Sequence, residues 1–278
     1  MIKNYKNHSS DHLHGRPSLC YDHGSHGLLS ERGGAYRHSR QNAFRHICAS
    51  AISDSRRRSY PLGGQAELAE ARAKNPDTVA WLYIPGAEVD DPVMQAEDNG
   101  YYLNRDELRE YSTWGCYYAD CRNHLSGRDA LDTNTVIYGH SANDCDPDGV
   151  RFTKLHRYMD ADFVKENPYI YLSVDGDDLI FQITALFITD TGFDYIDPNP
   201  MGSKLTDFFQ TVERKNWLDF DGVTFSEDDT VLTLSTCCRK YDKTNSGNQR
   251  LVVMAKLLPE GATAQDFSVS LVDDPEMP

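Results

Sequence analysis

The chain has 278 residues, of which 39% are hydrophobic and 11% aromatic, enough for one domain of about 200 residues plus an extra segment. Its formal net charge is −15 at pH 7, although residues 1–60 contain ten Lys/Arg and only four Asp/Glu. The rest of the chain is therefore strongly acidic, which argues against a nucleic-acid partner, because phosphate binding requires a basic face. No run approaches the roughly 18 apolar residues of a membrane-spanning helix, and no signal-peptide pattern is present.

Residues 1–62 differ from the rest of the chain in composition. They contain seven of the ten His, together with Arg, Ser and Gly, and they show no sustained hydrophobic periodicity. Such a segment buries too little apolar surface to offset the entropy of ordering it. We therefore predict a disordered or non-native leader, with a histidine-rich metal-binding tail as the alternative.

The first element predicted after the leader is a short helix over residues 65–74. This run (QAELAEARAK) consists of good helix formers and stops at Asn75-Pro76, as a helix should before proline. Residues 79–84 (VAWLYI) then predict a strand, which ends at the turn-forming pair Pro85-Gly86.

Most of the chain from there to residue 258 has the pattern of short strands. They are predicted near residues 91–95, 115–119, 134–139, 168–174, 178–189, 230–237 and 249–258. Short helical pieces are predicted near 98–111 and 151–165, and a clearer helix over about 201–216. Many short strands without strand–helix alternation indicate a mainly β fold, a closed or nearly closed β-barrel with helices outside. We expect the main domain to span 63–260 and to be followed by an acidic, frayed tail over 261–278.

Three strand ends carry side chains that together can attack a peptide carbonyl. Residues 231–237 (VLTLSTC) end on Cys237, residues 135–140 (TVIYGH) end on His140, and the last strand begins near Arg250. Because alternate side chains of a strand share a face, neighbouring pairing of the last two strands would set Cys237 opposite Arg250. A thiolate is a nucleophile, an imidazolium is a general acid for a leaving amine, and a guanidinium stabilises an oxyanion. The pattern predicts a cysteine acyl-transferase.

Each of these residues also has a purely structural explanation. A cysteine within a strand is usually a small buried hydrophobic residue, a histidine after Tyr-Gly fits a turn, and an arginine at a strand edge is usually solvated. Taken alone, the sequence pattern leaves a non-catalytic β-barrel binding module open.

Other chemistries fit the pattern less well. Papain-like enzymes place their cysteine before the histidine, a caspase-like Gln-Ala-Cys is absent, and Arg250 lies too far from Cys237 for a phosphatase loop. Zinc is the main rival from another class, but the spacing of its candidate ligands is irregular and no Cys-x-x-Cys pair occurs. Those candidates are Cys116, Cys121, His124, His140 and Cys145. The adjacent Cys237 and Cys238 form either a strained vicinal disulfide or a nucleophile with a bystander thiol.

With these residues considered, the chain resembles the class B sortases from about residue 75 to residue 258. Residues 75–86 (NPDTVAWLYIPG) and 91–95 (DPVMQ) resemble the first barrel strands of that class. Residues 138–140 (YGH) resemble its histidine motif and residues 233–237 (TLSTC) its cysteine motif. Arg250 falls where the family arginine opens the final strand, and the helix near 201–216 matches the insertion that marks class B.

The resemblance implies an eight-stranded barrel with an N-terminal helix, acting as a cysteine transpeptidase on the outer face of a Gram-positive cell. Such enzymes cut a sorting signal of surface proteins after threonine, hold the acyl group as a thioester and pass it to an amine. By resemblance, Cys237 is the nucleophile, His140 the general acid/base and Arg250 the oxyanion or substrate clamp. The groove residues implied are Tyr138, Tyr195, Ile196 and Ser235.

The resemblance further implies a signal similar to Asn-Pro-x-Thr-Asn and a peptidoglycan-precursor amine as acceptor. A pilin-polymerising sortase with a lysine acceptor is the alternative within the family. We expect no cofactor, no metal, no nucleic-acid partner and a monomer. Two features depart from the family pattern: residues 1–60 show no membrane anchor, and Cys238 stands where relatives often carry a polar or acidic residue.

Overall fold

The computed structural model describes residues 63–142, 149–220, 223–242, 247–262 and 268–278. The predicted leader over residues 1–62 lies outside these ranges.

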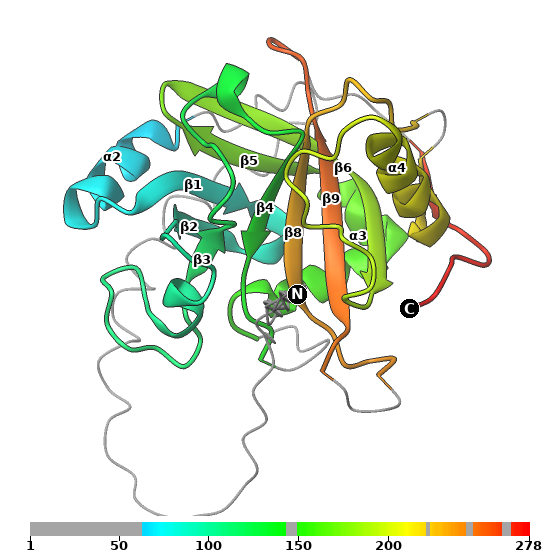
Figure 1. The fold of residues 1–278 in the computed structure, drawn as a ribbon, viewed down its shortest axis with the longest axis horizontal. Coiled ribbons are helices and arrows are strands. Elements are labelled where there is room, and N and C mark those ends of the chain that lie inside the picture. Colours follow the sequence, from blue (N-terminus) through cyan, green and yellow to red (C-terminus); the bar gives the residue numbers. More distant parts are fainter. Residues whose placement is uncertain (1–62, 143–148, 221–222, 243–246, 263–267) are drawn as a thin grey trace, which may run out of the picture.

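Eight strands close into a barrel, with helices packed on its outside (Figure 1). Around the barrel the order is β1-β2-β3-β4-β8-β9-β6-β5, and pairing of β5 with β1 closes it. All neighbours are antiparallel except β2–β3 and β4–β8, which are parallel. The barrel strands are β1 (Thr78–Ile84), β2 (Val89–Met94), β3 (Tyr117–Ala119), β4 (Asn134–Tyr138), β5 (Tyr169–Val174), β6 (Asp177–Thr189), β8 (Val231–Cys237) and β9 (Arg250–Leu257). The mainly β, eight-stranded fold predicted from the sequence is confirmed.

The barrel interior is filled by the alternate residues of these strands. On β1, Ala80, Leu82 and Ile84 are fully buried while the residues between them are only partly covered. They pack with inward-facing residues from the other strands, such as Phe181 and Leu234. Burying one such side chain stabilises the fold by about 1.5–3 kcal/mol, so the interior fixes which face of each strand points outward.

The helices lie outside the barrel and are short. They are α2 (Gln65–Lys74), η1 (Pro85–Ala87), η2 (Tyr101–Asn104), η3 (Arg128–Ala130), η4 (Phe152–Met159), α3 (Ala161–Glu166) and α4 (Ser203–Lys215). Helix α4 packs Phe208, Phe209 and Val212 against the outward-facing Ala185 and Phe187 of β6. Its position ahead of β8 agrees with the helix predicted near residues 201–216.

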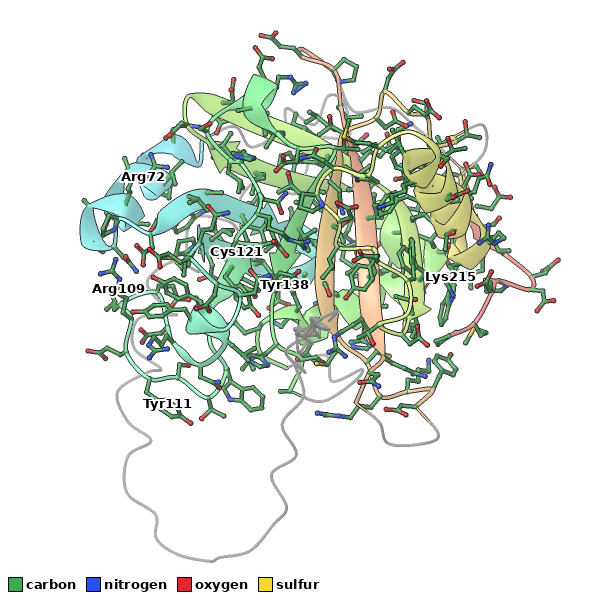
Figure 2. The ribbon with its side chains drawn as sticks, viewed as in Figure 1. Arg72, Arg109, Tyr111, Cys121, Tyr138 and Lys215 are labelled. Atoms are coloured by element: carbon green, nitrogen blue, oxygen red, sulfur yellow. The ribbon has the colours of Figure 1, made fainter. Side chains whose placement is uncertain are left out.

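The segment predicted as helical near 98–111 is helical only in the single turn η2. Beyond Asn104 the chain forms a loop closed by backbone hydrogen bonds, including Asp106 N–H to the Glu110 carbonyl (2.9 Å) and Ser112 N–H to the Asn104 carbonyl (3.1 Å). Arg109 lies in the left-handed region with φ of 67° and forms an ion pair with Asp77 (2.8 Å). Figure 2 shows Tyr111 projecting from this loop.

The expectation of a frayed C-terminal tail is wrong for residues 268–278. There β10 (Val269–Leu271) pairs antiparallel with β7 (Leu218–Phe220), a strand that sequence patterns did not reveal. Farther on, the Glu276 carboxylate contacts Lys215 (2.9 Å) and Arg214 (3.2 Å) at the end of α4. A backbone ladder and a pair of cations therefore hold a tail whose composition alone suggested disorder.

Within the described ranges, no helix combines the length and the apolar character needed to cross a membrane.

Candidate active site

The parallel pairing of β4 with β8 brings His140 and Cys237 together. Tyr138 pairs with Ser235 at the end of that ladder. Two parallel strands advance in the same direction, so two further residues along each lead to His140 and to Cys237. His140 lies two residues after Tyr138 and Cys237 two residues after Ser235. Because alternate residues of a strand share a face, both side chains fall on the outward face of the barrel.

Two hydrogen bonds hold the strands together beyond the last ladder pair. Gly139 N–H donates to the Ser235 carbonyl (3.2 Å), and the Thr236 hydroxyl donates to the Gly139 carbonyl (2.6 Å). These bonds fix the backbone immediately before the histidine and immediately before the cysteine.

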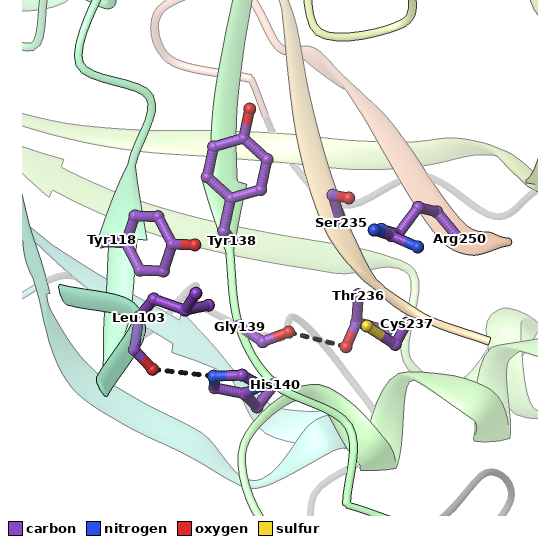
Figure 3. Close-up of a pocket in the computed structure, with 9 residues that line it drawn as sticks. All are labelled: Leu103, Tyr118, Tyr138, Gly139, His140, Ser235, Thr236, Cys237 and Arg250. Carbon is purple, nitrogen blue, oxygen red and sulfur yellow. Dashed lines mark hydrogen bonds between the residues drawn. The ribbon is translucent and has the colours of Figure 1, made fainter. Parts of the chain in front are cut away.

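Arg250 lies on β9, on the side of Cys237 away from β4 and His140. Arg250 and Cys237 are directly paired in the antiparallel β8–β9 ladder, as the sequence predicted. The arginine is 3% exposed, and its Nη1 donates to the carbonyls of Gly247 (2.8 Å) and Gln249 (2.9 Å) in its own hairpin. These bonds orient it towards Ser235 and Cys237 (Figure 3).

The imidazole of His140 is held by the main chain of η2. Its Nε2 lies 2.8 Å from the Leu103 carbonyl oxygen, which accepts the ring proton and so assigns the other nitrogen, Nδ1, as the one that can exchange a proton with a substrate. The Trp114 ring lies edge-on at 6.4 Å between centroids. Burial lowers the pKa of His140 below 6.5, assisted by the positive charge of Arg151 and opposed by the Leu103 carbonyl.

A glycine permits the loop to approach Leu103 this closely. Gly115 has φ of 48°, and a Cβ there would lie 2.5 Å from the Leu103 oxygen and 2.6 Å from the Tyr102 oxygen. The carbonyl that orients His140 is therefore itself packed in place by Gly115.

The three predicted catalytic residues line one small pocket (Figure 3). Its cavity volume is about 10 Å³, room for roughly one water molecule. The other lining residues are Leu103, Tyr118, Tyr138, Gly139, Ser235 and Thr236. Sequence reasoning missed Leu103 and Tyr118. Leu103 contributes a backbone carbonyl, which leaves no sequence signal, and Tyr118 has the same pattern as any other strand tyrosine.

Of the four predicted groove residues, Tyr138 and Ser235 line the pocket. Tyr195 is buried behind it, where its hydroxyl shares a hydrogen bond with the Ser235 hydroxyl (2.9 Å). Ile196 is not among the lining residues and packs against two hydrophobic clusters outside the barrel, near α4 and near Tyr138.

A buried carboxylate supports the wall formed by Tyr138. The Tyr138 hydroxyl donates to Asp120 (2.8 Å), which also accepts from the Arg122 guanidinium (2.8 Å). Burial opposes the charge of Asp120, but the hydrogen bonds from Arg122 and Tyr138 hold its pKa below the usual range. Burial and that charge together raise the pKa of Tyr138, so the wall presents a neutral phenol.

The zinc site and the vicinal disulfide considered from the sequence can be compared with the described residues. Within the ranges that the structure describes, no group of three or more His, Cys, Asp or Glu is arranged to hold a metal ion. Of the zinc candidates weighed above, Cys145 lies outside those ranges. Cys237 and Cys238 are not joined in a disulfide, and Cys238 packs into the barrel interior, on the face opposite the pocket.

Comparison with known proteins places this arrangement in a family. The model of the sortase domain matches residues 82–258, more than half of the chain. The chain belongs to the sortase family. Sortase B of Listeria monocytogenes is 33% identical over 193 residues, 69% of this chain and 74% of that protein.

Solved sortase B structures share the fold. The Staphylococcus aureus sortase B–substrate complex has a TM-score of 0.59 and 28% identity, covering 70% of this chain and 86% of that one. A sortase B complexed with triglycine has a TM-score of 0.60 and 27% identity, covering 72% and 89%. This sortase is therefore a cysteine transpeptidase of the kind that anchors surface proteins to the Gram-positive cell wall.

We expect Gly115→Ala to impair catalysis by this sortase, because the new Cβ must displace the carbonyl that orients His140. A displacement of this kind costs about 10- to 100-fold in kcat. Gly176→Ala is the matched control, since Gly176 also has positive φ (76°) but no atom lies within 4 Å of its Cβ position. Steady-state rates of peptide transfer for both variants check the prediction, and equal rates would contradict it.

In the substrate-free enzyme we expect His140 to titrate below its ordinary pKa of 6.5 and to be neutral at pH 7. Between the two pKa values the unfolded chain binds more protons than the folded one, so stability falls as pH falls through that window. NMR titration of the imidazole, assigned with His140→Gln, measures the value. A pKa above 6.5 would instead indicate a stable ion pair with the Cys237 thiolate.

Proposed function

We propose that this sortase cleaves a sorting signal of a surface protein after threonine and transfers the acyl group to an amine of a peptidoglycan precursor. The observation that carries the proposal is the convergence of Cys237, His140 and Arg250 on one pocket. We further propose that it acts on the outer face of the cell membrane, because its relatives act on cell-surface proteins.

In the first half of the reaction, the Cys237 thiolate attacks the threonine carbonyl carbon. Arg250 donates hydrogen bonds to the oxyanion that develops or to the adjacent substrate backbone, a role suited to a planar, permanently charged fork. As the C–N bond breaks, the imidazolium of His140 gives its proton from Nδ1 to the leaving amine. The product is a thioester on Cys237.

In the second half, the incoming amine gives a proton to the neutral His140 and attacks the thioester carbonyl. The C–S bond breaks, the thiolate is restored and a new amide forms. Because burial lowers the pKa of His140, the neutral imidazole is available for the step in which it accepts a proton, whereas the first half requires the form that carries both the imidazolium and the thiolate.

The substrate classes are proposed from the relatives. The S. aureus relative has been solved with a substrate, and another sortase B with triglycine. We propose an Asn-Pro-x-Thr-Asn-like signal as acyl donor and a glycine-type amine as acceptor. The outer-face wall of Tyr138 and Ser235 would contact the donor peptide.

Cys237→Ala should abolish the covalent acyl adduct with an Asn-Pro-Gln-Thr-Asn peptide while the fold survives. Wild-type enzyme should form the adduct and, with triglycine present, release a product ending in Thr-Gly-Gly-Gly. Mass spectrometry of protein and products checks both. An adduct that persists in Cys237→Ala would overturn the nucleophile assignment, and transfer only to a protein lysine would replace the proposed acceptor by that of a pilin polymerase.

Arg250→Lys should lower kcat/KM by about 100-fold or more, because an ammonium cannot reproduce the guanidinium fork at a buried site. The hairpin carbonyls of Gly247 and Gln249 would also lose a donor. Lys256→Met, at the other end of β9, is the control for a lost strand cation. Steady-state kinetics decide the matter: turnover near the wild-type rate in Arg250→Lys would contradict the clamp role.

A further inference from the structure

Arg151 lies eleven residues beyond His140 and has an unusual backbone. Its φ of 52° and ψ of −132° fall in a region that L-residues rarely adopt. Non-glycine residues persist there only when the surrounding structure holds them, and such residues cluster at functional sites. The contacts that hold Arg151 in this conformation therefore indicate what the residue does.

The backbone of Arg151 is tied to the strand end that carries the histidine. Arg151 forms an isolated β-bridge with Ser141, the residue after His140. The next residue, Phe152, donates its N–H to the His140 carbonyl (2.9 Å). Through these contacts Arg151 is attached to His140 from the main-chain side.

The side chain of Arg151 is tied to the loop that contacts the imidazole from the other side. Nη1 donates to the Glu107 carboxylate (2.8 Å) and Nη2 to the Gly115 carbonyl (2.5 Å). The guanidinium also lies over the Tyr117 ring, 5.3 Å from its centroid. Gly115 is the residue packed against the Leu103 carbonyl, and it follows Trp114, whose ring contacts His140.

The ion pair between Arg151 and Glu107 is largely shielded from solvent, so losing either partner disturbs the other. The Arg151 side chain is 17% exposed and that of Glu107 28%. Breaking a pair of this kind leaves an uncompensated charge out of water and loosens whatever the pair joins. The charge of Arg151 also acts on the carboxylate of Asp91. Burial is the main cause that raises the pKa of Asp91 to about 6, and the positive charge of Arg151 limits that rise.

We propose that Arg151 is a positioning residue for His140. Its guanidinium clamps Glu107 and the Gly115 carbonyl to the strand end bearing the histidine, and so holds the imidazole against the Leu103 carbonyl for proton transfer. The inference rests on the proposed role of His140 as general acid/base and adds a residue outside the pocket on which that role depends.

Arg151→Met keeps most of the side-chain volume but removes the charge and the fork. We expect kcat for transfer of an Asn-Pro-Gln-Thr-Asn peptide to triglycine to fall about 10- to 100-fold with little change in KM, because proton transfer rather than binding is disturbed. Two opposing effects then act on the pKa of His140: loss of the Arg151 charge raises it, and loss of the Leu103 hydrogen bond lowers it. Arg151→Lys keeps the charge but loses the fork that joins Glu107 to the Gly115 carbonyl. If the fork positions the imidazole, the Leu103 bond weakens and the pKa of His140, measured by NMR, falls below the wild-type value, with kcat still reduced. A wild-type pKa and a wild-type kcat in this variant would overturn the proposal.

Arg157→Met is the matched control on the same helical segment. Arg157 also joins a carboxylate, that of Glu88 (3.1 Å), to a carbonyl, that of Gly86 (3.3 Å). We expect this variant to retain wild-type kcat and the wild-type His140 titration. Equal losses in Arg151→Met and Arg157→Met would overturn the proposal, as would wild-type kcat in a folded Arg151→Met.

Glu107→Gln provides the test if Arg151→Met does not fold, because it weakens the clamp and leaves Arg151 in place. A fall in kcat supports the proposal, and a wild-type kcat overturns it. If the wild-type enzyme itself does not transfer the peptide, the proposed function fails. The NMR titration of His140 in the Arg151 variants does not need turnover and judges the positioning role separately.

Discussion

The site depends on one constraint, the register of the parallel β4–β8 ladder. Tyr138 lies opposite Ser235, so equal steps along both strands lead to His140 and Cys237. A slip of one residue would turn one of the two side chains from the outer face into the barrel. Leu234 and Ile137 in the interior and Tyr138 on the outside hold this register, so packing of the core decides whether the sulfur and the imidazole meet.

Main-chain carbonyls orient two of the three proposed catalytic side chains and the residue before the third. Leu103 accepts from His140, Gly247 and Gln249 accept from Arg250, and Gly139 accepts from Thr236 beside the nucleophile. Carbonyls impose direction without adding a titratable charge to a small pocket, and so the pKa of His140 is set chiefly by burial. The charged supports, Asp120 and Glu107, stand one layer farther out.

Strand positions could be predicted because alternation is a local signal, and it sets Cys237 opposite Arg250 if the last two strands are neighbours. The role of His140 beside them comes from the family resemblance, since the parallel β4–β8 pairing leaves no local signal. What could not be predicted depends on contacts distant in sequence. The loop after η2 has a helical composition, yet its backbone bonds and the Arg109–Asp77 pair override that propensity. The tail over 268–278 has the composition of a frayed segment, but β7 supplies a strand with which it pairs. Tyr195 reaches the pocket only through Ser235, and Ile196 does not line it, since the loop's path decides which side chains arrive there.

The bond between His140 and the Leu103 oxygen has a consequence for how this enzyme can vary and be probed. A peptide oxygen is present whatever amino acid occupies that position, so alanine scanning would pass over residue 103 without registering its contribution. Natural drift can likewise exchange the leucine without losing this bond, provided that the turn keeps its path. At residue 103 itself, the dependence is exposed by chemistry that alters the polypeptide, such as replacing the amide after Leu103 by an ester to weaken its oxygen as an acceptor.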